Sequence, residues 1–361
     1  MHVDWNWIKQ RPHFLYEELT QYFKIDLFYI KKLYKGSRKD TLRNKRKTYT
    51  ASKILRILKL PLSGRSKILR MVERILNFRV SYCLKKYDYI WITSPILLDF
   101  IDLEILENKR IIYDCMDDFL SFYEDDEKVR KMKVLEKKLI ERSDVIIASS
   151  LHLKETILSR YSVNKTIYLI NNGISDSLLN QEKSVVPKYS LIKSSGNDIN
   201  LIYIGTVGGW LDFDLILRLL GDFPNVIFHL IGPVEVKVLS HPRIKILGAV
   251  PHDNLFYLAQ QADGLVMPFQ LNDLVRSVDP VKIYEYILFN KPIFAIDYKE
   301  MHKFLPYVNL YSNYEMLSGY IRMLEKDELT SVFDIEKRAF LEKHTWQERA
   351  KRIDLILKET S

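Results

Sequence analysis

The chain contains little cysteine, proline or glycine for its 361 residues, and it has no long apolar run. Its two cysteines, Cys83 and Cys115, lack metal-site spacing, so the sequence favours a reducing compartment, the cytosol, over a disulfide framework. The 12 glycines and 12 prolines argue against a low-complexity or fibrous chain. No run of about 18 apolar residues occurs, and His2, Asp4 and Asn6 at the start are unlike a secretory signal. We therefore expect no membrane span and no signal segment.

A large apolar fraction is arranged in an alternating pattern along the chain. Hydrophobic residues make up 47% of a chain that is longer than one core of ordinary size, which predicts two domains and a cleft. Short β-branched and aromatic runs alternate with helical patterns, which is typical of an α/β fold with parallel sheets. The expected strands fall in two similar sets, 25–30, 89–93, 110–113, 144–148 and 166–170, then 200–204, 226–231, 244–247, 264–267 and 292–296.

The boundary between the two domains is expected in residues 176–198, which are polar and small with weak periodicity. Thr345 and Glu348 have the spacing of a capping box and predict a helix after them. Only residues 1–4 precede the first loop, so the first strand of the N-terminal domain is expected to be truncated. The expected division is an N-terminal domain 1–175, a C-terminal domain 176–345 and a final helix 346–361.

Positive charge is concentrated in residues 31–86, which hold 19 lysines and arginines against only Asp40 and Glu73. This segment carries a charge of +17 in a chain whose net charge is +9. Basic residues at every third position predict an amphipathic helix at 53–60, and a second is predicted at 67–76. Such helices can lie on an anionic membrane, where each basic residue contributes about 1 kcal/mol. A solvated basic face and nucleic-acid binding are the alternatives, and no nucleic-acid motif accompanies the charge.

The stretch from Asp279 to Glu285 carries the most specific chemical signal. Asp279 and Pro280 suit the N-cap and first turn of a helix that follows an expected strand. A helix N-terminus at the carboxyl end of a parallel strand can bind anions, and Arg276 and Lys282 add charge suited to a diphosphate. Glu285 lies one turn beyond Lys282 and could accept hydrogen bonds from two ribose hydroxyls. The alternative is an ordinary ion pair between Lys282 and Glu285.

A glycine-rich turn follows the strand expected at 200–204. Gly205, Thr206 and Gly208 stand where the chain passes from strand to helix, and glycine lets a backbone approach a phosphate closely. We therefore include Gly205 and Thr206 among the candidates for binding a phosphate, a role that the family resemblance described below assigns to the donor. A purely structural turn is the alternative.

The first loop concentrates aromatic, basic and acidic residues before a helix expected at 12–22. Asp4, Trp5, Trp7 and Arg11 suit an acceptor sugar, because aromatic rings can cover the apolar face of a sugar ring. The alternative is an aromatic staple for the helix that follows.

A second acidic group, Asp114, Asp117 and Asp118, follows the strand expected at 110–113. It therefore lies at the carboxyl edge of the first sheet, where a carboxylate could take the proton of an acceptor hydroxyl. Each aspartate could instead cap the next helix, and the two roles can coexist among three residues.

These segments resemble the GT-B glycosyltransferases, and in particular bacterial enzymes of cell-surface polysaccharide assembly, including the teichuronic acid group. The resemblance is carried by the Pro268-Phe269 strand end, the Pro-x-Lys-x-x-Glu-Tyr pattern of residues 280–286, the Lys291-Pro292 turn, and the first loop. It implies two Rossmann-like, doubly wound domains that face each other across a cleft, with the last helix returning toward the N-terminal domain.

The same resemblance implies roles for individual residues. Lys282 would contact the diphosphate of the donor and Glu285 its ribose. The loop from Gly248 to Asp253 would lie beside the base, for which uridine is expected. The candidates for the catalytic base are Asp117 or Asp118 and then Asp4.

Two positions depart from the pattern of that family. Many retaining members carry a second glutamate where this chain has Ser277, and the glycine turn lacks the basic residue often found there. Neutralisation of the diphosphate would therefore depend more on Arg276 and Lys282.

The sequence thus predicts an enzyme that transfers a sugar from a nucleoside diphosphate sugar, expected to be a UDP-sugar, to a lipid-linked or oligosaccharide acceptor. We expect no metal or other cofactor and no nucleic-acid partner. We expect residues 31–86 to attach the cytoplasmic protein to the anionic inner face of the plasma membrane. A nucleotide-sugar 2-epimerase of the same fold and a non-catalytic scaffold that binds nucleotide sugar are the alternatives, and a soluble epimerase has no use for the basic segment.

Overall fold

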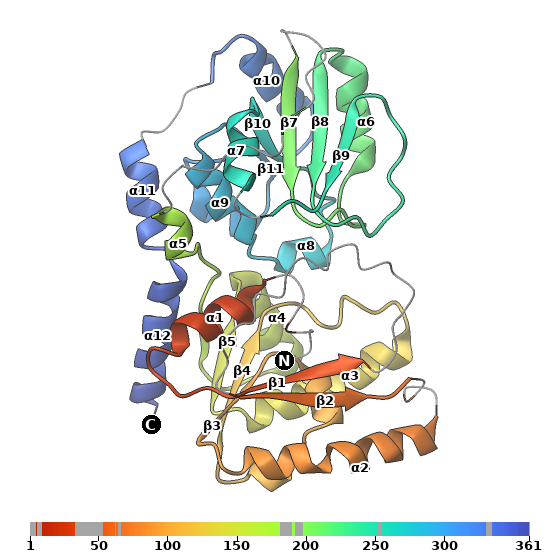
Figure 1. Cartoon of the computed structure of the whole chain (residues 1–361), viewed down its shortest axis with the longest axis vertical. Coiled ribbons are helices and arrows are strands. Elements are labelled where there is room, and N and C mark those ends of the chain that lie inside the picture. The colour runs from red at the N-terminus through yellow and green to blue at the C-terminus, as the bar shows by residue number, and fades with distance from the viewer. Residues whose placement is uncertain are drawn as a thin grey trace. The chain divides into compact units, whose positions relative to one another are not determined.

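The structure is a computed structural model that describes residues 5, 9–32, 53–61, 63, 66–180, 190–191, 198–251, 254–329 and 334–360. The chain divides into two compact units, each built on parallel β-structure of its own (Figure 1). Unit 1 comprises Met1–Asn172 and Trp346–Ser361, and unit 2 comprises Gly173–Thr345.

Unit 1 contains a two-stranded parallel pair, β1-β2, and a four-stranded parallel sheet of order β3-β4-β5-β6. Its elements are α1 (Arg11–Leu19), β1 (Leu27–Lys32), β2 (Ile54–Lys59), α2 (Lys67–Leu84), β3 (Tyr89–Ile92), η1 (Pro95–Asp99), η2 (Glu104–Leu106), β4 (Arg110–Cys115), α3 (Asp126–Arg142), β5 (Val145–Ala148), α4 (Leu151–Tyr161), β6 (Ile167–Leu169) and α12 (Trp346–Glu359). One face of the larger sheet packs on α3 and α4, and the other packs on α1 and α12. Phe14 of α1 stacks on Trp346 of α12, with ring centroids 5.1 Å apart.

Unit 2 contains one six-stranded parallel sheet of order β12-β11-β10-β7-β8-β9. Its elements are α5 (Asp176–Leu179), β7 (Ile199–Ile204), α6 (Phe213–Asp222), β8 (Val226–Ile231), β9 (Ile244–Gly248), α7 (Leu255–Gln260), β10 (Gly264–Met267), α8 (Asp273–Ser277), α9 (Val281–Phe289), β11 (Ile293–Ile296), η4 (Lys299–Phe304), β12 (Asn309–Tyr311), α10 (Tyr314–Glu325) and α11 (Asp334–Glu342). The chain adds β7, β8 and β9 toward one edge and then returns to add β10, β11 and β12 toward the other. The point at which the strand order reverses therefore lies between β7 and β10.

Alternate residues of β7 face two different apolar cores. Ile202 and Ile204 pack with α7 and α9 on one face of the sheet, while Leu201 and Tyr203 pack with α6 and α10 on the other. Every residue of β7 is buried, as expected for a central strand covered on both faces. This is a doubly wound arrangement, and the α/β fold class expected from the sequence is confirmed.

The ten strands expected from the sequence are all present, with ends shifted by no more than two residues. Two further strands were not expected. The edge strand β12 has only three residues, Asn309–Tyr311, and too short an apolar run to be recognised. The other is β2.

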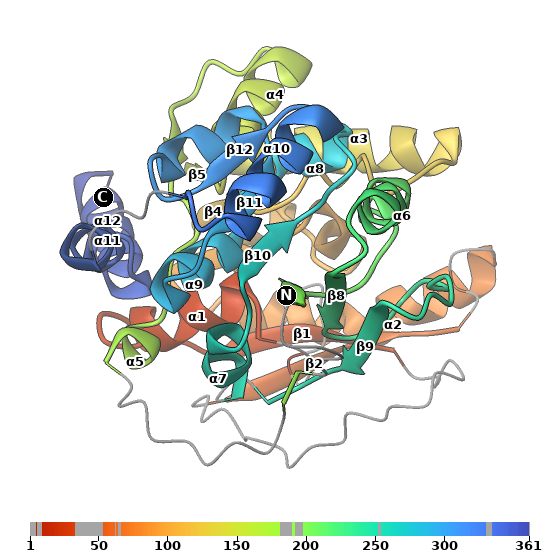
Figure 2. The same ribbon diagram turned by 90° about the horizontal axis from the view of Figure 1, so that it is seen from above.

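The prediction of a basic helix at 53–60 is wrong, because these residues form the strand β2. Parallel pairing with β1 extends from Leu27 opposite Ile54 to Lys32 opposite Lys59, and Figure 2 shows the two strands side by side. Ile57 is buried in the core of unit 1. The spacing of three between basic residues matched a helical period, but β-branched side chains and pairing with β1 decide the conformation. The second expected helix is present and extends further than expected, as α2.

The segment expected to be a linker, 176–198, begins with a helix instead of an irregular connection. Leu178 and Leu179 of α5, together with Leu191, are buried in the core of unit 2. The remainder of the segment, and the expected truncated strand at 1–4, lie largely or wholly outside the described residues. Within the described part of the chain, no helix has both the length and the apolar character needed to cross a bilayer.

Candidate functional site

The loops that follow β7 and β10 meet at the point where the strand order of unit 2 reverses. The backbone nitrogen of Asp212 donates to the carbonyl oxygen of Pro268 at 2.9 Å, and that of Gln270 donates to the carbonyl oxygen of Trp210 at 2.8 Å. These bonds join the two loops directly. In open parallel sheets, ligands bind at the carboxyl ends of the strands at this reversal point. This reversal point is therefore the candidate ligand site of unit 2.

Glycines occupy the carboxyl ends of three neighbouring strands of unit 2. Gly205 directly follows β7, Gly232 follows β8, and Gly248 ends β9. Gly232 has φ +147° and Gly248 has φ +69°, which favour glycine, and a Cβ on Gly232 would collide with the carbonyl oxygen of Gly205. Gly232 was not among the residues selected from the sequence. The Ile231-Gly232-Pro233 turn after an apolar run was the signal that could have identified it.

Helix α9 is attached to the end of β7 at this point. The Tyr286 hydroxyl oxygen accepts a hydrogen bond from the backbone nitrogen of Ile204 at 2.7 Å. One residue earlier, the Glu285 side chain is only 7% exposed, whereas the side chain of its partner Lys282 is 31% exposed. The Lys282 Nζ atom donates to both carboxylate oxygens of Glu285, at 2.8 and 2.9 Å. Because Glu285 is buried, this pair differs from the exposed helix pairs that contribute little to stability.

The expected capping role of Asp279 is wrong. Helix α9 begins at Val281 with Pro280 in the N-cap position, and no side chain caps it. The buried Asp279 carboxylate instead forms an ion pair with Lys303 of η4, Nζ to Oδ1 2.6 Å. A charge so deeply buried requires a cationic partner, and that requirement outweighs the local preference of aspartate for a cap. Lys303 thus anchors the connection that leads into α9.

The other donor-site candidates lie on the same connections. Arg276 is exposed near the end of α8, and Ser277 is buried with its hydroxyl donating to the carbonyl oxygen of Leu274 at 2.7 Å. Thr206 is half-buried, and its carbonyl oxygen accepts from the Tyr203 hydroxyl at 3.0 Å. Residues 252–253, in the loop expected beside the base, lie outside the described residues.

In unit 1, Arg11 is buried rather than placed on a loop. It opens α1, and its guanidinium donates to the buried Asp114 carboxylate at 2.9 to 3.3 Å and to the Asn172 side chain at 3.1 Å. This cluster ties α1 to the carboxyl end of β4. The prediction that Arg11 lies on the first loop is therefore wrong.

Trp5 is also buried in unit 1. Its ring stacks on His13 with centroids 4.3 Å apart and meets Tyr16 edge-on at 5.1 Å. The packing corresponds to the aromatic staple that was the alternative interpretation, so direct contact of this ring with a ligand would require local rearrangement. Asp4 and Trp7 lie outside the described residues.

The Asp118 carboxylate is fully engaged. Arg160 of α4 donates to both of its oxygens at 2.8 Å, and the Ser121 hydroxyl donates to Oδ2 at 2.9 Å. Burial alone would raise the pKa of Asp118, but the bonds from Arg160 and Ser121 outweigh it and lower the pKa. Buried Glu136 extends this network by accepting from the Tyr161 hydroxyl at 2.6 Å. A carboxylate held in this way is a poor proton acceptor.

Asp117 has the opposite environment. It is half-buried at the carboxyl end of β4, and its carboxylate has no hydrogen bond or ion pair within the part of the chain that the structure describes. Burial raises its pKa to about 7; Arg11 opposes the shift, and the Asp114 and Asp118 carboxylates add to it. A carboxyl group with this pKa can exchange a proton near neutral pH.

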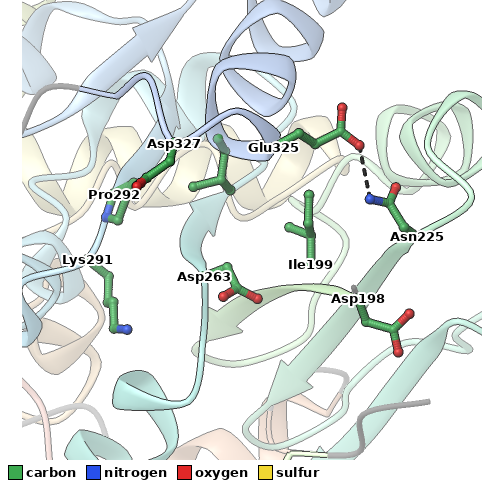
Figure 3. A pocket seen from close by; sticks show the side chains of 9 residues that line it. Asp198, Ile199, Asn225, Asp263, Lys291, Pro292, Glu325 and Asp327 are labelled. Carbon is green, nitrogen blue, oxygen red and sulfur yellow. Dashed lines mark hydrogen bonds between the residues drawn. The ribbon is translucent and has the colours of Figure 1, made fainter. Parts of the chain in front are cut away.

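A cavity of about 590 Å³ lies at the opposite, amino-terminal edge of the sheet of unit 2 (Figure 3). Asp198, Asp263, Glu325 and Asp327 line it, with Lys291 as the cation among its lining residues, and Asn225 donates to Glu325 at 3.0 Å. Carboxylates repel a diphosphate, so this cavity does not suit a nucleotide. Among the described residues, no three His, Cys, Asp or Glu side chains gather so as to hold a metal ion.

No protein-family model matches the chain. The chain is similar to TuaH of Bacillus subtilis (strain 168), named provisionally as a teichuronic acid biosynthesis glycosyltransferase, with 23% identity over 236 residues. The match covers 60% of this chain and 58% of TuaH, so it spans less than two thirds of that relative.

Two solved structures are similar to the chain over most of its length. One is Anabaena HepE in complex with UDP, with TM-score 0.62, 13% identity, and 85% of this chain and 86% of HepE covered. The other is sucrose-phosphate synthase from Thermosynechococcus elongatus, with TM-score 0.68, 13% identity, and coverage of 96% and 92%. The fold is that of the GT-B glycosyltransferases, as expected from the sequence, and the relatives support a transferase.

Proposed function

We propose that this protein transfers a sugar from a nucleoside diphosphate sugar, preferably a UDP-sugar, to a glycan acceptor in the synthesis of a cell-surface polysaccharide. The observation that carries the proposal is the pair of half-buried Lys282 and buried Glu285 on α9, beside the strand-order reversal of unit 2. A nucleoside diphosphate can bind through a cation at its phosphates and a carboxylate at its ribose. Lys282 and Glu285 offer these two groups side by side. The UDP bound to HepE agrees with this class of donor, and the name of TuaH agrees with glycosyl transfer in polysaccharide synthesis.

In the proposed donor complex, Lys282 and Arg276 meet the diphosphate together with the free amides at the start of α9. Glu285 releases one or both bonds to Lys282 and accepts from the ribose hydroxyls. Gly205 and Thr206 let the backbone approach the phosphates, and Gly248 opens the loop beside the base. The departing diphosphate gains negative charge as the sugar leaves, and these groups stabilise that charge.

In the proposed acceptor complex on unit 1, Asp117 is the catalytic base. Its carboxylate takes the proton of the acceptor hydroxyl as that oxygen bonds to the anomeric carbon and the bond from this carbon to the diphosphate breaks. Its raised pKa and the absence of hydrogen bonds to its carboxylate among the described residues favour it over Asp118. Asp4 remains a second candidate.

The proposal includes a lipid-linked acceptor at the cytoplasmic face of an anionic membrane, reached through residues 31–86. The charge of this segment and the few cysteines of the chain support that location. Residues 33–52, which carry much of the charge, lie outside the described residues.

Calorimetric titration of UDP into wild-type protein and Lys282→Ala tests the donor site. Loss of a charge-assisted contact should weaken UDP binding by about tenfold to a hundredfold. Lys326→Ala removes an equal charge from the exposed end of α10 and should leave the affinity unchanged. Unchanged UDP affinity in Lys282→Ala would refute the assignment. Release of UDP from a UDP-sugar only when a glycan acceptor is present would separate a transferase from an epimerase or a scaffold.

A further inference from the structure

Helix α2 packs with a polar face turned toward the protein. Glu73 accepts a hydrogen bond from the backbone nitrogen of Leu60 at 2.7 Å. The Asn77 side chain accepts from the backbone nitrogen of Leu58 at 2.9 Å and donates to the carbonyl oxygen of the same residue at 2.8 Å. These bonds satisfy backbone groups at and just beyond the carboxyl end of β2, beside which α2 lies (Figure 1). The inward face of α2 is therefore attached by these hydrogen bonds at Glu73 and Asn77, and nearer its end by Val80 and Leu84, which are buried in the core of unit 1.

The outward face of the same helix is apolar. Ile68, Met71, Ile75, Phe78 and Tyr82 follow one another at intervals of three and four residues and are 76%, 65%, 63%, 61% and 68% exposed. Val72 and Leu76, also exposed, widen the stripe. Amphipathic helices of soluble proteins normally place such a face against their own core. A contiguous exposed apolar surface of this kind marks a contact with another apolar phase or partner.

The charges along α2 identify the kind of partner. Lys67, Arg70, Arg74 and Arg79 are all exposed, while the acidic side chain within the helix, Glu73, is buried and faces inward. A second copy of the chain would bring these cations against one another, whereas helices that pair usually place opposite charges beside the seam. An apolar face bordered by cations matches an anionic lipid surface, with acyl chains beneath phosphate groups.

We propose that α2 lies flat in the interface of an anionic bilayer, with its outward apolar face inserted among the acyl chains and its cations at the phosphates. This inference names the element that attaches the protein to the membrane, and it rests on the proposed function, which requires that attachment. The 18 residues of α2 span about 27 Å along the membrane plane. Docking by one rigid helix would hold unit 1 at the surface that carries a lipid-linked acceptor.

Co-sedimentation with phosphatidylcholine vesicles, with and without one third phosphatidylglycerol, tests the proposal on the full chain. Wild-type protein should bind the anionic vesicles more strongly, and added salt should weaken the binding. The double change Met71→Glu and Ile75→Glu should reduce binding by more than about tenfold. Arg74→Ala should reduce it by about fivefold, the effect of one cation. Val134→Glu, at an exposed apolar position of α3, is the matched control and should bind as the wild type does.

Equal vesicle binding by the double variant, or no preference of the wild type for anionic vesicles, would overturn the proposal. Sedimentation velocity supplies a further outcome: a dimer that the double variant abolishes would assign this face to a second copy. Circular dichroism and UDP titration show whether the double variant is folded and still binds nucleotide. Its spectrum and its UDP affinity should both match those of the wild type. Vesicle binding without UDP binding would leave the docking intact while refuting the proposed donor site, and the reverse result would refute only the docking.

Discussion

The hydroxyl oxygen of Tyr286 lies 2.7 Å from the backbone nitrogen of Ile204, so a side chain of α9 completes the hydrogen bonding at the end of β7. Tyr286 is fully buried and directly follows Glu285, and Ile204 directly precedes Gly205. One hydrogen bond thus fixes the helix that carries the charged pair against the strand that leads into the glycine turn. It therefore contributes, with the apolar packing of α9 on β7, to the relative position of the two parts of the proposed donor site.

We expect Tyr286→Phe to lower the free energy of unfolding by about 1–3 kcal/mol, because the buried nitrogen of Ile204 loses its partner. Urea denaturation measures this change. Tyr307→Phe removes an exposed hydroxyl that donates to the Glu336 carbonyl oxygen at 3.3 Å and is the control, with a much smaller expected effect. If the two variants lose the same free energy of unfolding, the hydrogen bond to Ile204 contributes no more to stability than an exposed one.

Glu285→Gln should weaken UDP binding by about tenfold to a hundredfold if its carboxylate accepts from ribose hydroxyls. Titration with 2′-deoxy-UDP isolates this contact, because the deoxynucleotide has already lost one of the hydroxyls. The substitution should therefore cost less affinity for 2′-deoxy-UDP than for UDP. The same loss for both nucleotides would place Glu285 away from the ribose.

Asp117→Asn should lower the turnover rate by about 10²–10⁴-fold, the usual contribution of a general base. In the wild type, kcat/KM should rise with pH through about 7, where Asp117 loses its proton, and then level off. The variant should lack this rise. A wild-type profile that is flat between pH 5 and 8 would remove Asp117 from the reaction, and Asp4→Asn would then be the next variant to measure.

The same aspartate predicts a pH dependence of stability. The pKa of Asp117 is about 7 in the folded protein and about 4 in an unfolded chain. Between these values the folded state binds more protons than the unfolded state, so stability falls as pH rises through this window and changes no further above it. The Asp117→Asn variant cannot lose stability in this way. In urea denaturation, the free energy of unfolding of the variant minus that of the wild type should therefore increase from pH 4 to pH 7. An advantage that stays constant with pH would contradict the raised pKa.

Arg160→Ala should destabilise unit 1 by about 3–5 kcal/mol at pH 7, because Asp118 becomes a buried carboxylate without its cation. The lowered pKa of Asp118 stabilises the fold, fully above the ordinary aspartate pKa, and this stabilisation is lost as pH falls below that value and through the lowered pKa of the folded protein. The cost of the substitution should therefore shrink toward acid pH. Arg338→Ala, which breaks the exposed pair with Glu342, should cost less than about 1 kcal/mol at either pH.

Sequence patterns were most reliable where a local property decides the structure. Central strands such as Val226–Ile231 were predicted with their observed ends, because an uninterrupted apolar β-branched run suits a strand buried on both faces. The same approach was wrong at 53–60, where the spacing of basic residues suggested a helix, and at Asp279, where Asp-Pro suggested a cap. In both places a partner distant in sequence, β1 or Lys303, decides the outcome.

The sequence by itself determined which residue types stand at the ends of the strands, since that follows from the order of strands, glycines and charged residues along the chain. It thereby selected Lys282 and Glu285, and it proposed Asp117 and Asp118 without separating them. Only the tertiary structure separated these two residues. Arg160 of α4, which is 42 residues from Asp118 in the sequence, donates hydrogen bonds to the Asp118 carboxylate. The Asp117 carboxylate has no hydrogen bond among the described residues, and its pKa is raised. The folded chain sets proton affinity through burial and neighbouring charges, and neither is contained in local sequence.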